Sequence, residues 1–313
     1  MTNLSANEQY ARIEDLPLLR GEGKFIDDID LPGMLEIAFV RSPHPHATIN
    51  SIDVSMALEL PGVKAVFVYD DVAAALTSMH MPGDQKASDA PAWSLAVVLP
   101  KDEVCFVGEA VAIVVAEDRY IAEDAVALVD VDYDFLPAVS DCKQAIAPDA
   151  PLAHSSGEGN VVGRITSSYG DCDACFNAPS RTVQVSLKQH RGGAHPIEGR
   201  GTVADYKPDD DMMTVWSSTQ KPHKLRNVLT ELFEADEMRL RVITPDVGGA
   251  FGAKAAIYPE EIAAKWPYVN VDGLLGAIVH PEDGYIQPAD LTAALAKGAR
   301  ARGATIQRYT TVL

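Results

Sequence analysis

The sequence predicts a chain of the α+β class, with about two domains. Three observations predict this class. The chain has 313 residues, of which 47% are hydrophobic and 23% charged, so it is large enough to bury more than one core. Segments with the period of a strand are mixed with segments that have the period of a helix. Residues 147–160, which are rich in proline, glycine and serine, divide the chain.

The first half of the chain has the pattern of a mixed sheet. Residues 34–40 alternate apolar and other side chains, which predicts a half-buried strand. Residues 110–116 form an unbroken apolar run, which predicts a strand buried on both faces. Asp118 is expected to cap a helix, and residues 129–133 return to a strand. The predicted buried side of that helix carries Ile121, Ala125 and Leu128.

The second half predicts strands that end in polar or glycine-rich loops. Strands are expected over residues 183–187, 213–216 and 239–244. The second of these strands leads into a polar turn that ends at Gln220, and Pro222 then suits the first turn of a helix. The predicted buried face of this helix carries Leu225, Val228, Leu229, Leu232 and Phe233.

Charge and cysteine content exclude several classes of function. The formal net charge is −19, which argues against binding to nucleic acid or to an anionic membrane. The first ten residues lack the basic and apolar parts of a signal peptide, and no apolar run is long enough to span a membrane. The chain has four cysteines, too few for a disulfide scaffold of this size. A cytoplasmic location is therefore expected.

No metal site is predicted from the sequence. Cys172 and Cys175 have C-x-x-C spacing, but one such pair supplies at most half of a tetrahedral zinc site. His44 and His46 have no third ligand near them in the sequence, which favours a structural role for both.

Two loops of the second half have the composition of a cofactor-binding site. Residues 248–252 include three glycines, which let backbone N–H groups approach a polar ligand. Gln220 stands between a predicted strand and a predicted helix, where its carboxamide can both donate and accept hydrogen bonds. Both features also have a purely structural interpretation, because glycine loops serve as turns and a glutamine can cap a helix. No phosphate-loop motif is present, so a nucleotide ligand is not predicted.

Taken in order, the motifs resemble those of molybdenum hydroxylase large subunits, the family of xanthine dehydrogenase, aldehyde oxidase and carbon monoxide dehydrogenase. The resemblance covers about residues 8–264. The matching motifs include Arg41-Ser42-Pro43-His44-Pro45-His46-Ala47, Val107-Gly108-Glu109-Ala110-Val111-Ala112, Pro196-Ile197-Glu198-Gly199-Arg200-Gly201, Ser218-Thr219-Gln220 and Gly248-Gly249-Ala250-Phe251-Gly252-Ala253-Lys254.

This resemblance implies a domain order. An aldehyde oxidase/xanthine dehydrogenase a/b hammerhead domain is expected first, followed by a truncated molybdopterin-binding domain. The expected divisions are a lead-in over 1–19, the hammerhead domain over 20–146, a linker over 147–160, the truncated molybdopterin-binding part over 161–264 and a foreign fragment over 265–313.

The resemblance also implies roles for the residues of the two loops. Gln220 matches the glutamine that hydrogen-bonds an oxo ligand of the molybdenum. Gly249, Ala250, Phe251 and Gly252 match the loop that holds molybdopterin. The Gln220 turn and the Phe251 turn are therefore expected to come together at adjoining strand ends and to form one wall of a pterin cleft. The family's general base is a glutamate far toward the C-terminus, and no residue of this chain is assigned to it, so no catalytic residue is predicted. The purine enzymes carry a substrate-binding glutamate just after the Gly-Gly-Lys turn. This chain has Ala255 there, which favours the carbon monoxide dehydrogenase-like or the aldehyde and heterocycle branches.

The last segment resembles a different family. Residues 266–313 are similar to an internal piece of the dimethylglycine and sarcosine dehydrogenase family of FAD oxidoreductases. The matching motifs are Asp272-Gly273-Leu274-Leu275-Gly276-Ala277 and Pro288-Ala289-Asp290-Leu291, and a helix is expected over residues 288–302. The glycines with which that family binds FAD belong to a segment that is missing here, so FAD binding is not expected.

Three hypotheses of function follow. The leading one is a truncated or chimeric molybdopterin-binding subunit of a molybdenum hydroxylase, inactive on its own. The intact family are oxidoreductases that hydroxylate an aldehyde, a heterocycle or a CO-like substrate. Molybdopterin is the implied cofactor, although its retention by this fragment is left open, and iron–sulfur and FAD subunits are the implied partners. The first alternative is a non-catalytic hammerhead module that docks on those subunits. The second is a fragment of a flavin-dependent amine dehydrogenase.

Overall fold

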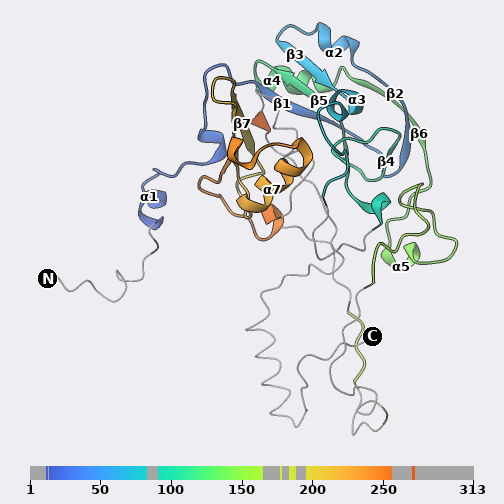
Figure 1. Cartoon of the computed structure of the whole chain (residues 1–313). Coiled ribbons are helices and arrows are strands. Elements are labelled where there is room, and N and C mark those ends of the chain that lie inside the picture. The colour runs from blue at the N-terminus through green and yellow to red at the C-terminus, as the bar shows by residue number, and fades with distance from the viewer. Residues whose placement is uncertain are drawn as a thin grey trace. The chain divides into compact units, whose positions relative to one another are not determined.

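The structure is a computed structural model that describes residues 12, 14–82, 91–164, 177, 183–187, 195–255 and 270–271. The chain divides into two compact units. One unit is Met1–Val162 with Gly193–Gly276, and the other is Gly163–Gly192 with Ala277–Leu313. The elements named below all belong to the first unit and are drawn in Figure 1.

Helices and strands alternate along this unit. The strands are β1 (Glu36–Arg41), β2 (Ala47–Asp53), β3 (Val63–Phe67), β4 (Glu103–Val104), β5 (Ala110–Ala116), β6 (Asp130–Phe135), β7 (Thr202–Lys207), β8 (Met212–Ser217), β9 (Leu240–Ile243) and β10 (Asn270–Val271). The α-helices are α1 (Asp15–Leu19), α2 (Ser55–Glu59), α3 (Tyr69–Ala73), α4 (Arg119–Val126), α5 (Cys142–Ala145) and α7 (Pro222–Phe233). Short 3-10 helices are η1 (Ile26–Asp28), η3 (Ala92–Ser94), η4 (Glu237–Arg239) and η5 (Ala253–Ala255).

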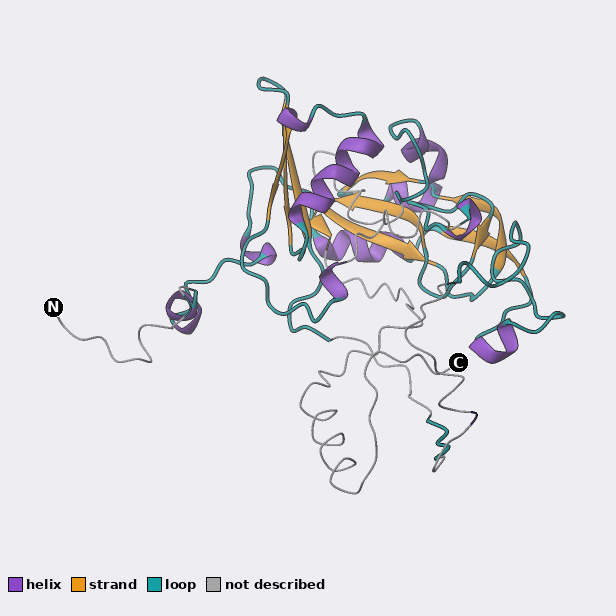
Figure 2. Cartoon of the chain, turned by 60° about the horizontal axis from the view of Figure 1, so that its bottom comes forward, coloured by secondary structure: helices purple, strands orange, loops and turns teal. Residues whose placement is uncertain are grey.

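The described strands form two sheets. The larger has the order β3-β5-β1-β10-β7-β8-β9, and the smaller has the order β4-β2-β6. In the smaller sheet β2 pairs antiparallel with both neighbours. Figure 2 shows helices and strands together in this unit, and the mixture confirms the predicted α+β class.

Strand β5 is buried along its whole length because both of its faces are covered. Alternate residues of a strand point to opposite faces. Ile113 and Val115 join one core together with Ile37 and Phe39 of β1. Val114 joins a second core, which Ala125 of α4 also enters. The sequence prediction for residues 110–116 is confirmed.

Helix α7 follows β8 as predicted. Pro222 is its first residue, and the buried residues of the helix are Leu225, Val228, Leu229 and Leu232. The carbonyls at its C-terminal end accept hydrogen bonds from Thr77. The Thr77 N–H donates to the Leu232 oxygen at 2.8 Å, and the Thr77 hydroxyl donates to the Glu231 oxygen at 3.0 Å. The first half of the chain therefore satisfies carbonyl groups that a helix end leaves without intrahelical donors.

Two local expectations were wrong. Residues 183–187, predicted as a strand, lie outside helices and strands, and Val183 and Leu187 are exposed. A strand needs a neighbour for its backbone N–H and C=O groups, and no described segment pairs with this one. Leu128 was expected on the buried side of α4, but the helix ends at Val126, so Leu128 lies beyond it and is exposed. The helix predicted over residues 288–302 lies outside the described residues, and of the foreign fragment only Asn270 and Val271, which form β10, are described.

Candidate functional site

Residues 218–220 form the turn that follows β8. Hydrogen bonds hold its backbone in place, and its last residue, Gln220, is exposed. Ser218 and Thr219 are buried, whereas Gln220 is exposed. Ser218 N–H donates to the Gly201 oxygen at 3.1 Å, and Gly201 N–H donates to Ser218 Oγ at 3.0 Å. Lys221 N–H donates to Thr219 Oγ1 at 3.1 Å. The backbone is thus fixed on both sides of Gln220, and its carboxamide has no hydrogen-bond partner among the described residues.

The loop over residues 248–252 has the backbone of a tight turn. Gly249 has φ 100°, Phe251 has φ 50° and Gly252 has φ 90°. Phe251 is a large apolar residue, yet it is 75% exposed. Its φ lies in the left-handed region, which is uncommon for residues other than glycine. Within the part of the chain that the structure describes, the N–H groups of Gly249, Ala250, Phe251 and Gly252 donate to no protein acceptor. Successive free N–H groups of this kind can receive the oxygens of an anionic ligand.

The Gln220 turn and this loop meet at the carbonyl of Lys254. Gln220 N–H donates to the Lys254 oxygen at 2.9 Å, and the Thr219 hydroxyl donates to the same oxygen at 3.3 Å. Thr219 and Lys254 are 35 residues apart in the sequence. These hydrogen bonds therefore place the two candidate cofactor-binding segments next to each other in the fold. The roles of Gln220, Gly249, Ala250, Phe251 and Gly252 stay predictions.

A buried ion pair between Lys254 and Glu198 holds the 248–252 loop in place. Lys254 Nζ lies 2.6 Å from Glu198 Oε2, and the two side chains are 1% and 13% exposed. The same carboxylate oxygen accepts the Gly248 N–H at 2.7 Å. A Cβ on Gly248 would lie 2.5 Å from the Cβ of Glu198, so only glycine fits there. The guanidinium of Arg200 adds a hydrogen bond of 2.6 Å to the Ala253 oxygen.

Glu198 and Lys254 stand in two separate motifs of the sequence, and their pairing was not predicted. Glu198 belongs to the Pro196–Gly201 motif, and Lys254 ends the glycine motif. A lysine directly after a glycine loop suggests a solvated side chain, since lysine is almost never fully buried unless it is paired. Only the fold, which brings together residues 56 apart, identifies the partner.

The two histidines of the first half lie in packed surroundings. The His44 ring contacts Tyr133 and Phe135, with ring centroids 5.0 and 4.5 Å apart. His46 is 5% exposed, and its Nδ1 lies 3.0 Å from the Pro137 oxygen. The structural role of His44 stays a prediction.

Comparison with known proteins defines the class of the molecule. Residues 20–137 match the aldehyde oxidase and xanthine dehydrogenase a/b hammerhead domain, and residues 153–268 match the molybdopterin cofactor-binding domain. The two matched domains are those of a molybdopterin-binding subunit. The chain belongs to the xanthine dehydrogenase family of molybdenum hydroxylases.

Individual relatives agree with this assignment. The chain is 39% identical over 255 residues to the nicotine 6-hydroxylase large subunit of Paenarthrobacter nicotinovorans, covering 82% of this chain and 31% of the relative. It is 38% identical over 267 residues to the carbon monoxide dehydrogenase large chain of Hydrogenophaga pseudoflava, covering 80% of this chain and 32% of the relative. The chain therefore spans about a third of the length of these relatives.

Solved structures share the fold. Quinoline 2-oxidoreductase from Pseudomonas putida 86 superimposes with a TM-score of 0.73 at 35% identity, covering 84% of this chain and 34% of that one. The Cu,Mo-CO dehydrogenase superimposes with a TM-score of 0.74 at 34% identity, covering 84% of this chain and 35% of that one.

In the described part of the chain, no helix has the length and apolar character that crossing a bilayer requires.

Proposed function

We propose that the Gln220 turn and the 248–252 loop form one wall of a molybdopterin site in a molybdenum hydroxylase. The observation that carries the proposal is the hydrogen bond of 2.9 Å from Gln220 N–H to the Lys254 oxygen, which holds the two segments side by side. Family membership supplies the identity of the cofactor, and the contact supplies a reason for these two segments to act together.

The groups on this wall suit such a cofactor. The exposed carboxamide of Gln220 can donate to an oxygen and accept from a second group. The N–H groups of residues 249–252 face no acceptor within the described chain, and they can receive oxygens of an anionic group. Lys254 does not contribute a free charge, because its ammonium is paired with Glu198. The residues therefore orient the cofactor by hydrogen bonds and leave its chemistry to groups elsewhere.

For the whole protein we propose oxidative hydroxylation of an aldehyde, a heterocycle or a CO-like substrate. When bound, the molybdenum cofactor supplies the redox step. A purine is disfavoured because Ala255 offers no carboxylate to bind it. The nicotine and carbon monoxide relatives, at 39% and 38% identity, are also more similar than the Bacillus subtilis xanthine dehydrogenase subunit at 32%. This chain alone is expected to be inactive, since none of its residues is assigned as the base.

Replacement of Gln220 by alanine is expected to lower cofactor retention about tenfold, the effect of losing roughly 1.5 kcal/mol from a hydrogen bond to a charged group. The full chain is expressed in a host that makes the cofactor, and molybdenum and pterin are measured per purified chain. Gln144→Ala, an exposed glutamine in α5, is the matched control and should retain the wild-type amount.

Equal retention in Gln220→Ala and wild type would overturn the assignment of this turn. Substrate-dependent dye reduction by the purified chain would contradict the expectation that it provides only one wall of the site.

We also propose that the hammerhead part docks on iron–sulfur and flavin subunits. Support comes from the relatives, which are named as a large subunit, a large chain and, in a third case, a subunit of a dehydrogenase complex. Tagged full-length chain, co-expressed with iron–sulfur and flavin subunits of a carbon monoxide dehydrogenase-type enzyme, is expected to co-purify with them. Elution of the chain free of both subunits would remove this support.

A further inference from the structure

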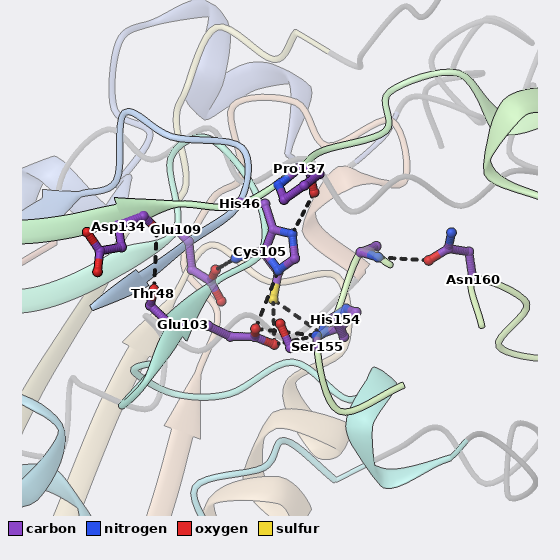
Figure 3. A network of polar contacts seen from close by, with 11 residues as sticks. His46, Thr48, Glu103, Cys105, Glu109, Asp134, Pro137, His154, Ser155 and Asn160 are labelled. Atoms are coloured by element: carbon purple, nitrogen blue, oxygen red, sulfur yellow. Dashed lines mark hydrogen bonds and ion pairs between the residues drawn. The ribbon is translucent and has the colours of Figure 1, made fainter. Parts of the chain in front are cut away.

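A second group of reactive side chains lies in the smaller sheet, within the first half of the chain. The antiparallel pairing of Ala47 with Val104 and of Thr48 with Glu103 sets β2 beside β4. His46 directly precedes β2, and Cys105 directly follows β4, so the pairing places both at one end of the two strands. Figure 3 shows these side chains gathered with Glu103 and His154.

The ligand atoms of this group have the spacing of a small metal site. One atom each of His46, Glu103 and Cys105 lies within 4.8 Å of the others. His46 Nε2 is 3.4 Å from Glu103 Oε2, and Cys105 Sγ is 3.7 Å from Glu103 Oε1. His154 Nδ1 lies 3.3 Å from Cys105 Sγ, although His154 is not one of the three residues whose ligand atoms all lie within 4.8 Å of one another. Bonds of about 2.0–2.3 Å to tetrahedral zinc place neighbouring ligand atoms about 3.3–3.8 Å apart.

The hydrogen bonds of His46 orient it as a ligand. A carbonyl oxygen can only accept, so the contact of 3.0 Å between His46 Nδ1 and the Pro137 oxygen requires a proton on Nδ1. In the neutral ring this leaves the lone pair of Nε2 directed at a carboxylate oxygen of Glu103. A second proton on Nε2 allows a hydrogen bond to Glu103, and a cation between the two atoms can take the place of that proton. A backbone carbonyl that receives the other ring N–H is the usual support of a metal-bound histidine.

The other three groups differ in how ready they are to bind a cation. Burial, together with the Glu109 and Glu103 carboxylates, raises the pKa of the Cys105 thiol far above its ordinary value. Burial opposes ionisation of Glu103, but hydrogen bonds from Ser155 and His46 outweigh it and lower the pKa of this carboxyl. Burial lowers the pKa of His154, which favours the neutral ring that a metal ligand needs. The Cys105 thiol must lose its proton when a cation binds.

We propose that His46, Glu103 and Cys105, with His154 as fourth ligand, bind one divalent cation of the zinc class. Thiolate, imidazole and carboxylate together are the donor set of zinc and not of calcium or magnesium. The sequence predicted no metal site because Glu103 lies 57 residues from His46, and His154 lies 49 residues from Cys105. The bound ion would hold the 147–160 segment against the smaller sheet.

The segment that carries His154 is already positioned for this role. Ser155 N–H donates to Glu103 Oε1 at 2.9 Å, and the Trp93 ring lies 5.6 Å from the His154 ring. Asn160 closes the segment by accepting the Ala153 N–H at 2.8 Å and donating to the Pro151 oxygen at 2.8 Å. These contacts hold His154 beside Cys105 before any cation binds.

Cobalt(II) is the probe, because it occupies zinc sites and absorbs light. The chelator-treated full chain is titrated with cobalt(II). Binding should give a thiolate-to-cobalt charge-transfer band, saturate at about one ion per chain and release about one proton, that of Cys105. Zinc(II) added afterwards should bleach the band.

Variants assign the band to this group. Cys105→Ser should abolish it, and His154→Gln should weaken cobalt binding at least tenfold. Two controls should keep the full band: Cys142→Ser, an exposed free thiol, and the double variant Cys172→Ser/Cys175→Ser, whose cysteines lie outside the described residues. Circular dichroism without metal verifies that each variant is folded.

Two results would overturn the proposal. One is the absence of a charge-transfer band in the wild-type chain. The other is a band that survives Cys105→Ser but disappears from the Cys172→Ser/Cys175→Ser variant, which would place the ion on the C-x-x-C pair. If Cys105→Ser does not fold, the His154→Gln variant decides, and unchanged cobalt affinity in it would exclude His154 as a ligand.

Discussion

Replacement of Glu198 by glutamine is expected to lower the free energy of unfolding by about 3–5 kcal/mol, the cost of leaving one member of a buried ion pair without its partner. Lys254 is 1% exposed in its side chain and lies 2.6 Å from Glu198. Glutamine keeps the size of the side chain but removes the charge, so an uncompensated ammonium is left in the interior. Urea unfolding followed by circular dichroism measures the change.

Two variants test the cause of this loss. Glu123→Gln breaks the ion pair between Arg119 and Glu123, whose side chains are 50% and 54% exposed. This change should lower the free energy of unfolding by less than about 1 kcal/mol. The double variant Glu198→Gln/Lys254→Met removes both buried charges and should recover part of the lost stability. Equal losses from Glu198→Gln and Glu123→Gln would show that the buried pair does not stabilise the loop.

Replacement of Leu225 by alanine is expected to cost about 2–5 kcal/mol, because a fully buried leucine leaves a cavity that its surroundings fill only in part. Leu225 is 0% exposed and lies in the first turn of α7, soon after the Gln220 turn. Thermal and urea unfolding of the purified variant measure the loss.

Leu19→Ala is the matched control, because Leu19 is 85% exposed. Its unfolding free energy should stay within about 0.5 kcal/mol of the wild-type value. A Leu225→Ala variant as stable as Leu19→Ala would mean that α7 is not anchored by this residue.

The parts of the fold that were predicted are those with a strong local pattern. The run Ala110–Ala116 is apolar at every position, and Asp118 caps α4 through a hydrogen bond of 2.9 Å to Ile121 N–H. By contrast, β2 and β7 were not predicted. Asn50, Ser51 and Asp53 of β2 are exposed and polar, so the pairing of β2 with β6 sets its conformation more than its own side chains do.

The turns at Gln220 and Phe251 were predicted to come together, and the hydrogen bond from Gln220 N–H to the Lys254 oxygen bears out their proximity. Glycine content and a glutamine at a strand end indicated the two loops, and the family resemblance gave them a role. Their contact through the Lys254 oxygen, the burial of Lys254 and the grouping of Glu103 and Cys105 about His46 all depend on long-range pairing. A single sequence carries no local signal for such contacts, because each partner has an ordinary neighbourhood of its own.

The hydrogen bonds between Thr77 and the end of α7 bear on how the molecule can be divided. The core on one face of β1 and β5 includes Leu225, Leu229 and Leu232, so the helix and these strands share a single apolar interior. A fragment cut at the limits of the hammerhead match, residues 20–137, would lack α7 and its side chains in this core. Thr77 would then lose the carbonyl groups that accept its hydrogen bonds. The limits of the hammerhead match are therefore not the limits of a unit that folds cooperatively. Shortened versions of this chain should keep α7.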